Sequence, residues 1–206
     1  MRTDPIYLIG AGGHGRVVAG ALLAAGVDAA TIVVRDGRTG LTMLGRAVLT
    51  PEVTETMAGR RFHVTVGASA IRARLHSAAL SAGAIPITVI HPAAVVSADA
   101  MLEDAVLVAA TAVVAPGAHV GTGTIVNHAA VVDHEIRIGT FCHIAPNATL
   151  GGGVTLGDRV MVGAGAVVLP NLSVASDVTI GAGAVVLRSI GEAGIWIGNP
   201  ARRLAR

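Results

Sequence analysis

The chain has 206 residues, of which 52% are hydrophobic, 14% charged and only 2% aromatic. This length suits one domain or two small ones, and the high apolar content with little charge excludes an intrinsically disordered chain. A formal net charge of +2 and so few aromatic side chains provide neither a basic surface nor a base-stacking platform, so no nucleic-acid partner is expected.

The apolar residues are not arranged for a membrane. Their longest runs, such as residues 105–116, fall short of the roughly 18 residues that a spanning helix needs, so we expect no membrane insertion. Asp4 and Pro5 stand where a signal peptide would have a basic and then an apolar segment. The single cysteine, Cys142, cannot form an internal disulfide, which fits a reducing compartment. The sequence therefore predicts a cytoplasmic protein.

Residues 1–90 are predicted to form a small α/β domain of the doubly wound kind. In chain order, apolar runs and glycine punctuation predict strands at 6–9, 31–34, 61–67 and 85–90, with helices at 16–25 and 70–82. This alternation indicates a parallel, doubly wound sheet. The domain is too short for a dehydrogenase with a substrate domain of its own, so we expect it to hold a nucleotide as a handle.

A glycine-rich segment between the first strand and helix is the candidate nucleotide site. Gly10, Gly12 and Gly15 fit the G-x-G-x-x-G spacing, in which glycines let backbone N–H groups approach a pyrophosphate at a helix N-terminus. Asp36 follows the second strand, where an acid can bind a ribose hydroxyl. A glycine turn that only packs the helix on the strand is the alternative. Gly12, Gly13 and Asp36 are candidate substrate-binding residues.

Residues 91–206 carry a six-residue repeat that predicts a β-solenoid. A branched aliphatic residue recurs at every sixth position without an insertion: Val96, Leu102, Val108, Val114, Val120, Val126, Val132, Ile138, Ile144, Leu150, Leu156, Val162, Val168, Val174, Ile180 and Val186. A second column, mostly small or β-branched, follows each of them by four positions, from Ala100 to Ile190. A short strand plus a corner, repeated as the sides of a prism, produces this period. Three sides use eighteen residues, so the repeat predicts about five coils.

Two further expectations follow from the repeat. Glycine comes directly after the aliphatic residue at several corners, where a turning chain would favour a residue with positive φ: Gly121, Gly139, Gly151, Gly157, Gly163 and Gly181. Cys142 belongs to the second column and is expected to be a buried space-filling residue rather than a nucleophile.

This pattern resembles the hexapeptide-repeat acyltransferases. The resemblance implies a left-handed parallel β-helix and a homotrimer, neither of which periodicity alone determines. With the Gly-Ala-Gly-Gly-His-Gly segment at residues 10–15, essentially the whole chain is similar to the sugar acetyltransferases of the NeuD/PglD type. That similarity implies that the α/β Rossmann-like half domain holds the nucleotide of the sugar and that the all-β helix, residues 91–206, holds acetyl-CoA.

The resemblance also implies an activity. It points to an acetyl-CoA-dependent N-acetyltransferase that acts on a nucleotide-diphosphate-linked 4-amino-4,6-dideoxy sugar for surface glycan biosynthesis. O-acetylation of sialic acid or a related sugar is the alternative within the family. The nucleotide, whether UDP, GDP, dTDP or CMP, is left open, with a UDP- or GDP-linked sugar leading. No metal is required by this chemistry.

Acyl transfer needs a base, a partner that orients the base, and donors facing the developing oxyanion. His134 lies two positions after the inward residue Val132, so its ring is expected to face outward. A neighbouring carboxylate, Glu135 or less readily Asp133, would fix its tautomer and increase its basicity.

The family pattern is an asparagine, then seven residues later a histidine followed by an acid, then nine residues later a second histidine. It matches Asn127, His134, Glu135 and His143. By this resemblance His134 is the general base, Glu135 its partner, and Asn127 and His143 help to place the acetyl donor. His134 and His143 are half a coil apart and should lie on different sides of one prism, so active sites are expected between subunits.

Further ligand contacts are implied by the same resemblance. The pantetheine arm of acetyl-CoA should meet backbone groups of Gly152, Gly163, Ala164 and Ala182. The terminal Gly-x-Pro-Ala motif, with Pro200 and Arg202, should close over the cofactor.

Two residues of the first domain join this set. His14 should lie near the nucleotide or sugar, although a helix cap is an equally plain interpretation. Gly67 should contact substrate after the third strand, but the chain continues with Ala68 and Ser69 where family members have an amide or acid.

Two other classes of protein remain as alternatives. A zinc carbonic anhydrase of the gamma type binds metal through three histidines, but the spacings of His128, His134 and His143 differ from that family's pattern. A catalytically silent trimer that only binds nucleotide sugars is the second alternative, because a fold does not determine a function.

Overall fold

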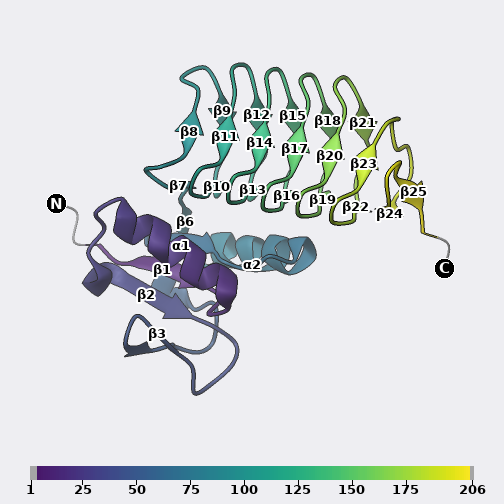
Figure 1. Cartoon of the computed structure of the whole chain (residues 1–206). Coiled ribbons are helices and arrows are strands. Elements are labelled where there is room, and N and C mark those ends of the chain that lie inside the picture. The colour runs from purple at the N-terminus through teal and green to yellow at the C-terminus, as the bar shows by residue number, and fades with distance from the viewer. Residues whose placement is uncertain (1–3, 205–206) are drawn as a thin grey trace.

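The computed structural model describes residues 4–204, and the chain divides into an α/β domain and a long solenoid (Figure 1). The elements of the α/β domain are β1 (Ile6–Ile9), α1 (Gly13–Ala24), β2 (Ile32–Arg35), β3 (Thr42–Met43), β4 (Arg46–Ala47), β5 (Arg61–Val64), α2 (Ser69–Ser81) and β6 (Ile85–Pro86), with 3-10 turns at Ala29–Thr31 and Glu55–Met57. The predicted alternation of strands and helices is confirmed. The short antiparallel pair β3–β4 was not predicted.

The α/β domain has three layers. Its parallel sheet has the order β2-β1-β5-β6. Alternate side chains of a strand point to opposite faces, so Leu8 packs with Val18 of α1, whereas Ile9 packs with Leu75 of α2. The two helices therefore cover opposite faces, and both begin at the carboxyl edge of the sheet, where the ends of β1 and β5 meet.

The predicted strand at 85–90 is two strands that belong to different sheets. Ile85–Pro86 is the edge of the α/β sheet, whereas β7 (Val89–Ile90) pairs with β10 of the solenoid. Thr88 lies between them, and its hydroxyl donates to the Glu103 carbonyl at 2.8 Å. The chain therefore enters the solenoid before His91.

The solenoid is a parallel β-helix of six coils, one more than the repeat count predicted. Its first sheet, here sheet C, contains β7, β10 (Leu107–Val108), β13 (Ile125–Val126), β16 (His143–Ile144), β19 (Met161–Val162), β22 (Val178–Ile180), β24 (Gly194–Ile197) and β25 (Arg202–Arg203). Sheet D contains β8 (Val95–Val96), β11 (Val113–Val114), β14 (Val131–Val132), β17 (Thr149–Leu150), β20 (Val167–Val168) and β23 (Val185–Val186). Sheet E contains β9 (Met101–Leu102), β12 (His119–Val120), β15 (Arg137–Ile138), β18 (Thr155–Leu156) and β21 (Ser173–Val174). The extra coil arises because β7 starts the prism earlier and Ile190 still bridges to Val174 at its end.

Both predicted columns of the repeat point inward and form one continuous core. Cys142 belongs to this core and is 0% exposed, as predicted. Burial raises the pKa of its thiol to about 12, so it is an inert space-filling group.

The expectation for the corner glycines was wrong. None of the glycines directly after the aliphatic position has a positive φ; the left-handed residue comes two positions later, as at Gly123 and Glu135. A Cβ on Gly121 would instead lie 2.7 Å from the Gly139 carbonyl carbon of the next coil. At Gly121, Gly139, Gly157 and Gly163 glycine relieves a close approach to the backbone of the next coil, and at Gly151 and Gly181 a close approach to Pro170 and Ile197; at none of them does it supply an unusual backbone angle.

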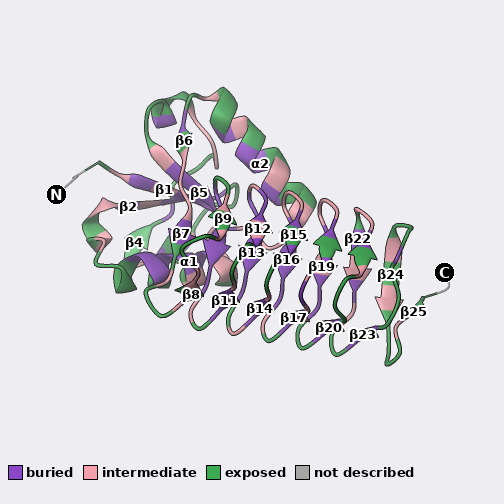
Figure 2. Ribbon diagram, turned by 90° about the horizontal axis from the view of Figure 1, so that it is seen from above, coloured by how far each residue is buried: buried purple, intermediate pink, exposed green. Residues whose placement is uncertain are grey.

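The α/β domain docks on the first coils of sheet C. The outward side chains of β7, β10 and β13 are Val89, Leu107 and Ile125, all at most 3% exposed, and they pack in the cluster that includes α1. Figure 2 shows α2 running beside the same coils. Beyond β13 the outward column of sheet C continues as His143, Met161 and Thr179, of which the latter two are only half-buried.

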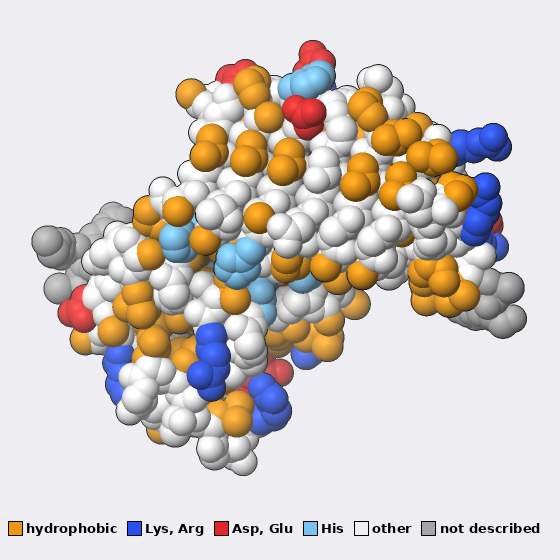
Figure 3. All heavy atoms as spheres, viewed as in Figure 1, with side chains coloured by type: hydrophobic (Ala, Val, Ile, Leu, Met, Phe, Trp, Pro, Cys, Tyr) orange, Lys and Arg blue, Asp and Glu red, His pale blue; other side chains and the backbone are white. Residues whose placement is uncertain are grey.

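Sheet D presents an apolar outer face. Its outward positions are valine in every coil but one: Val95, Val113, Val131, Thr149, Val167 and Val185. Figure 3 shows this row of hydrophobic side chains along the solenoid. The outward column of sheet E is mostly polar, with His119, Arg137, Thr155 and Ser173.

A hairpin closes the far end of the solenoid. Strand β24 stacks in parallel on β22 and then turns into the antiparallel β25. Trp196 of β24 packs against the end of the core. Among the described residues, no helix is long and apolar enough to cross a membrane.

Candidate active site

The glycine loop has the geometry of a phosphate-binding turn. Gly10 has a φ of +119° and approaches Val66 and Thr65, while a Cβ on Gly15 would run into the Gly10 carbonyl, so both are needed where α1 meets the loop. A Cβ on Gly12 or Gly13 would meet no atom within 4 Å. These two glycines therefore pack against nothing and leave open space at the start of α1, where we predicted substrate.

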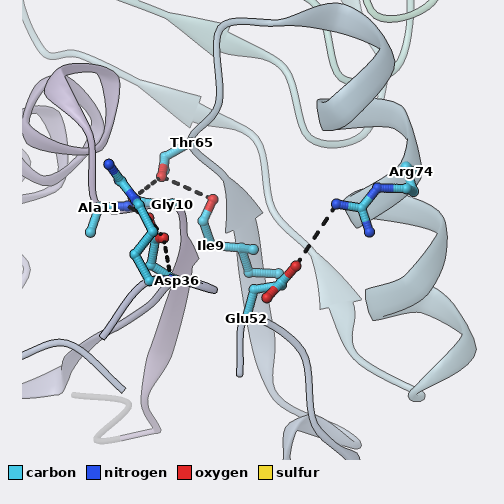
Figure 4. A network of polar contacts seen from close by, with 8 residues as sticks. Ile9, Gly10, Ala11, Asp36, Glu52, Thr65 and Arg74 are labelled. Carbon is cyan, nitrogen blue, oxygen red and sulfur yellow. Dashed lines mark hydrogen bonds and ion pairs between the residues drawn. The ribbon is translucent and has the colours of Figure 1, made fainter. Parts of the chain in front are cut away.

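Asp36 closes the glycine loop from the end of β2. One carboxylate oxygen accepts the Ala11 N–H at 2.8 Å (Figure 4). Arg38 donates to both carboxylate oxygens. The Arg38 hydrogen bonds hold the pKa of Asp36 well below its usual range, so it is a carboxylate at neutral pH. Asp36 lies where the sequence predicted, beside the loop, but its oxygens already hold the loop in shape.

His14 follows the loop in the first turn of α1 and faces the solenoid. Gly12 is the N-cap and no side chain caps this helix, so the interpretation of His14 as a cap is wrong. The His14 ring centroid lies 6.1 Å from that of His143, and its Nε2 atom is buried without a hydrogen-bond partner. Burial, followed by the charge of His143, lowers the pKa of His14 to about 3.

Asn127 and His143, which we expected to help place the acetyl donor, form a hydrogen-bonded pair. The Asn127 Oδ1 atom accepts the His128 N–H at 2.9 Å, so its Nδ2 group donates to His143 Nε2 at 3.1 Å. This assigns the proton of a neutral His143 to Nδ1. Burial, followed by the charge of Arg72, lowers the pKa of His143 to about 4, so the ring is neutral at physiological pH.

Gly67 lies against the other edge of the same ring. A Cβ on Gly67 would be 3.8 Å from His143 Cε1, so the loop after β5 and strand β16 meet at van der Waals distance. Both residues line a cavity of about 480 Å³ between the start of α2 and sheet C, together with Ala68, Ser69, Ala70, Arg159, Met161, Asp177 and Thr179. The structure thus places Gly67, His14 and His143 from three separate segments around one region.

His134 and Glu135 lie elsewhere, on the corner between β14 of sheet D and β15 of sheet E. His134 Nδ1 is 3.3 Å from Glu135 Oε2, and both side chains are largely exposed, at 58% and 79%. A proton on Nδ1 facing the carboxylate leaves Nε2 as the free, basic nitrogen. This is the outward orientation and the partner that the sequence predicted.

Gly152, predicted as a contact for acetyl-CoA, stacks on this histidine. It occupies the same corner one coil later, and its Cβ would overlap the His134 ring. Gly152 therefore leaves the space in which the ring lies.

The other predicted acetyl-CoA residues lie on a different edge. Gly163 and Ala164 follow β19, and Ala182 follows β22, so they share with Asn127 the edge between sheets C and D. Within one chain the predicted set is therefore divided between two edges of the prism.

Pro200 and Arg202 belong to the terminal hairpin. Arg202 is exposed and lines a cavity of about 360 Å³ together with Arg188 and Trp196. In the single chain the hairpin packs on the last coil, and its predicted role over acetyl-CoA stays a prediction.

Sequence reasoning missed Arg72, the most buried cation of the site. It occupies the first position of the buried face of α2, with Leu75, His76 and Ala79 at the i+3, i+4 and i+7 positions. Arg72 and His76 make up half of the buried face of α2, so no apolar stripe in the sequence marks Arg72 as buried. Within residues 4–204, no cluster of three histidine, cysteine or acidic side chains is placed to hold a metal.

Comparisons with known proteins agree with this architecture. The family described as PglD N-terminal domain matches residues 5–79, and the family of bacterial transferase hexapeptide repeats matches residues 135–170 and 153–188. The acetyltransferase domain of PglB from Neisseria gonorrhoeae is 36% identical over 98% of this chain and 100% of its own, with a TM-score of 0.91. The chain belongs to the hexapeptide-repeat acetyltransferases of the PglD type.

Other members of this family have been solved with ligands. PerB, the perosamine N-acetyltransferase of Caulobacter crescentus, was solved with CoA and GDP-perosamine; it is 32% identical over 98% of both chains, with a TM-score of 0.91. WeeI from Acinetobacter baumannii, at 22% identity and a TM-score of 0.85, shares the fold. No match was found among curated protein sequences.

Proposed function

We propose that this enzyme transfers the acetyl group of acetyl-CoA to the amino group of a nucleotide-linked sugar. The observation that carries the proposal is the end-to-end similarity to a perosamine N-acetyltransferase solved with CoA and GDP-perosamine. The N-terminal domain supports it, because the helices α1 and α2 both begin at the carboxyl edge of the sheet without a capping side chain or an acid in the first turn. Their free N–H groups suit the diphosphate of a nucleotide sugar.

His134 is the proposed general base. Its Nδ1–H is oriented by Glu135, so Nε2 accepts the proton of the attacking amine as nitrogen bonds to the thioester carbonyl carbon. The same proton can then pass to the departing thiolate of CoA. Asn127 and the neutral His143 supply N–H donors near the acetyl group, where an oxyanion develops.

The proposed active form is a homotrimer. His134 and His143 lie on different sides of one prism, so a complete site needs the His134 edge of one subunit beside the His143 face of another. The valine row of sheet D supports this assembly, because Val95 is 62% exposed and a continuous apolar face of this kind marks an interaction surface. In the trimer, Arg188 and Arg202 would meet the phosphates of CoA.

The test is thiol release from acetyl-CoA with a panel of UDP-, GDP-, dTDP- and CMP-linked amino sugars and with sialic acid. The wild type should turn over one nucleotide-linked amino sugar, and His134→Ala should lower kcat by about 100-fold or more. His119→Ala is the matched control, because His119 also pairs with a glutamate on the solenoid, at 3.0 Å from Glu103. Turnover of sialic acid alone would favour O-acetylation, and a silent panel would favour the non-catalytic binding protein.

A further inference from the structure

Arg72 links the two domains at the candidate site through hydrogen bonds from all of its guanidinium N–H groups. Its side chain is 2% exposed, and its N–H groups all donate to backbone carbonyls: Nε to Gly123 at 2.7 Å, Nη1 to Val66 at 2.9 Å and Gly67 at 2.7 Å, and Nη2 to Phe141 at 2.7 Å and Cys142 at 3.0 Å. A guanidinium has five N–H groups in a fixed planar fork. All of them are used, and none is directed to a side chain.

These carbonyls come from both sides of the candidate site. Val66 and Gly67 form the loop between β5 and α2, which lines the cavity on the nucleotide-domain side. Gly123 lies on the corner between sheets E and C, and Phe141 and Cys142 lie on the same corner one coil later, directly before His143. One rigid group therefore links the loop that faces His143 to the segment that carries His143.

The charge of Arg72 has no acidic partner. Among the described residues, no ion pair includes it. Burial lowers the pKa of Arg72 to about 10, so it is still a cation at neutral pH. A buried, unpaired charge is costly, and apolar side chains join domains at lower cost, as Leu107 and Ile125 do in the same interface. Stabilising the interface between the domains therefore does not explain why an arginine, and not an apolar residue, occupies this position.

We propose that Arg72 is a positioning residue for acetyl transfer, whose planar guanidinium holds the Val66–Gly67 loop at one distance and orientation from His143. The proposal rests on the proposed function, in which the loop lies on the acceptor side and His143 on the acetyl-donor side. Reacting atoms must be held aligned and about 3–3.5 Å apart, and a misplacement of about 1 Å costs roughly 100-fold in rate. Arg72 also contributes charge: it is among the groups that lower the pKa of His14 and of His143.

Lysine separates geometry from charge at this position. An ammonium group keeps the positive charge but has three donors that diverge from one point, so it cannot reach both pairs of carbonyls. Arg72→Lys should lower kcat by about 10-fold or more, measured well below its melting temperature. The KM for acetyl-CoA should stay within about twofold, since the edge formed by Gly163, Ala164 and Ala182 is not touched.

Two variants of the same helix serve as controls. Arg74→Lys changes an exposed arginine that pairs with Glu52, and should be unchanged in kcat (Figure 4). Leu75→Ala removes a buried side chain from the core beside α2 but none of the hydrogen bonds that Arg72 makes. It should therefore lower the melting temperature but leave kcat within about twofold. If Leu75→Ala and Arg72→Lys lose kcat equally at equal loss of stability, or if Arg72→Lys keeps its kcat, the proposal is wrong. If Arg72→Lys does not fold, Arg72→Gln, which removes the buried charge and keeps two donors, takes its place with the same expectation.

The wild type in the same assay tests the proposed function separately. If it acetylates none of the acceptors, amide hydrogen exchange of the intact protein decides the positioning role. Arg72→Lys should then speed exchange in residues 141–143, whose N–H groups are all hydrogen-bonded, whereas Leu75→Ala should leave their exchange unchanged. Unchanged exchange at 141–143 in Arg72→Lys overturns the proposal.

Discussion

Replacing Gly152 with alanine should displace the His134 ring while leaving the solenoid backbone in place. The new Cβ would lie 2.5 Å from His134 Cε1, and ordinary contacts begin at 3.4 Å, so the ring must move by about 1 Å. The His134 side chain is 58% exposed and can swing toward solvent, so the free energy of unfolding should change by less than about 1 kcal/mol. If His134 is the general base, a displacement of this size should lower kcat by roughly 100-fold.

The assay is thiol release from acetyl-CoA at saturating substrates, alongside thermal unfolding. Gly157→Ala is the matched control, because its Cβ would meet the backbone nitrogen of Ser176 at 2.6 Å, and a stacked coil cannot move aside. That variant should lose about 1–3 kcal/mol of stability, as overpacked sites do, with kcat within about threefold at low temperature. If Gly152→Ala keeps its kcat, the His134 ring is not required in this position. If Gly152→Ala loses as much stability as Gly157→Ala, the His134 ring does not swing toward solvent to make room for the new Cβ.

Two more outcomes are expected. Burial lowers the pKa of His63 from 6.5 to about 4, so the unfolded chain binds the additional proton, and His63 should contribute a loss of about 3 kcal/mol of stability as the pH falls from 6.5 toward 4. Burial lowers the pKa of His14 and His143 as well, so the total loss should be larger. Urea unfolding at pH 7 and pH 4.5 measures the total, which should be smaller in His63→Gln; an equal loss in that variant would contradict the assignment to His63. Val131→Glu places a charge in the valine row of sheet D, so it should give monomers in light scattering and abolish turnover. Met101→Glu is the control: Met101 lies on β9 of sheet E and is 64% exposed, so this variant should remain trimeric. A trimeric Val131→Glu would place the interface elsewhere.

The solenoid was predictable because its information is local and repeated. Each coil solves the same packing problem, so aliphatic residues at every sixth position reveal both the strand and its inward side chain. The start of the prism was harder to predict, because Val89 and Ile90 continue an apolar run from the preceding strand and only their pairing with β10 separates them. The corner glycines were misinterpreted for a related reason. Their requirement comes from the backbone of the next coil, eighteen residues away, and not from their own turn.

The candidate site divides in the same way. The glycine loop, Asp36, and the Asn127, His134, Glu135 and His143 set are visible in the sequence because their chemistry depends on residue type and short spacing. The approach of His14 and Gly67 to His143, and the stacking of Gly152 on His134, depend on how the domains dock and how coils stack.

What the sequence determined by itself is therefore the pair of folds, the identity of the reactive groups and the separation of His134 from His143 by half a coil. Only the tertiary structure decided where the α/β domain rests on the solenoid, because that position depends on the fit of Val89, Leu107 and Ile125 against α1 and on the carbonyls that converge on Arg72. A planar cation can satisfy five carbonyls only when two domains bring them together, and no pattern within either domain encodes that geometry.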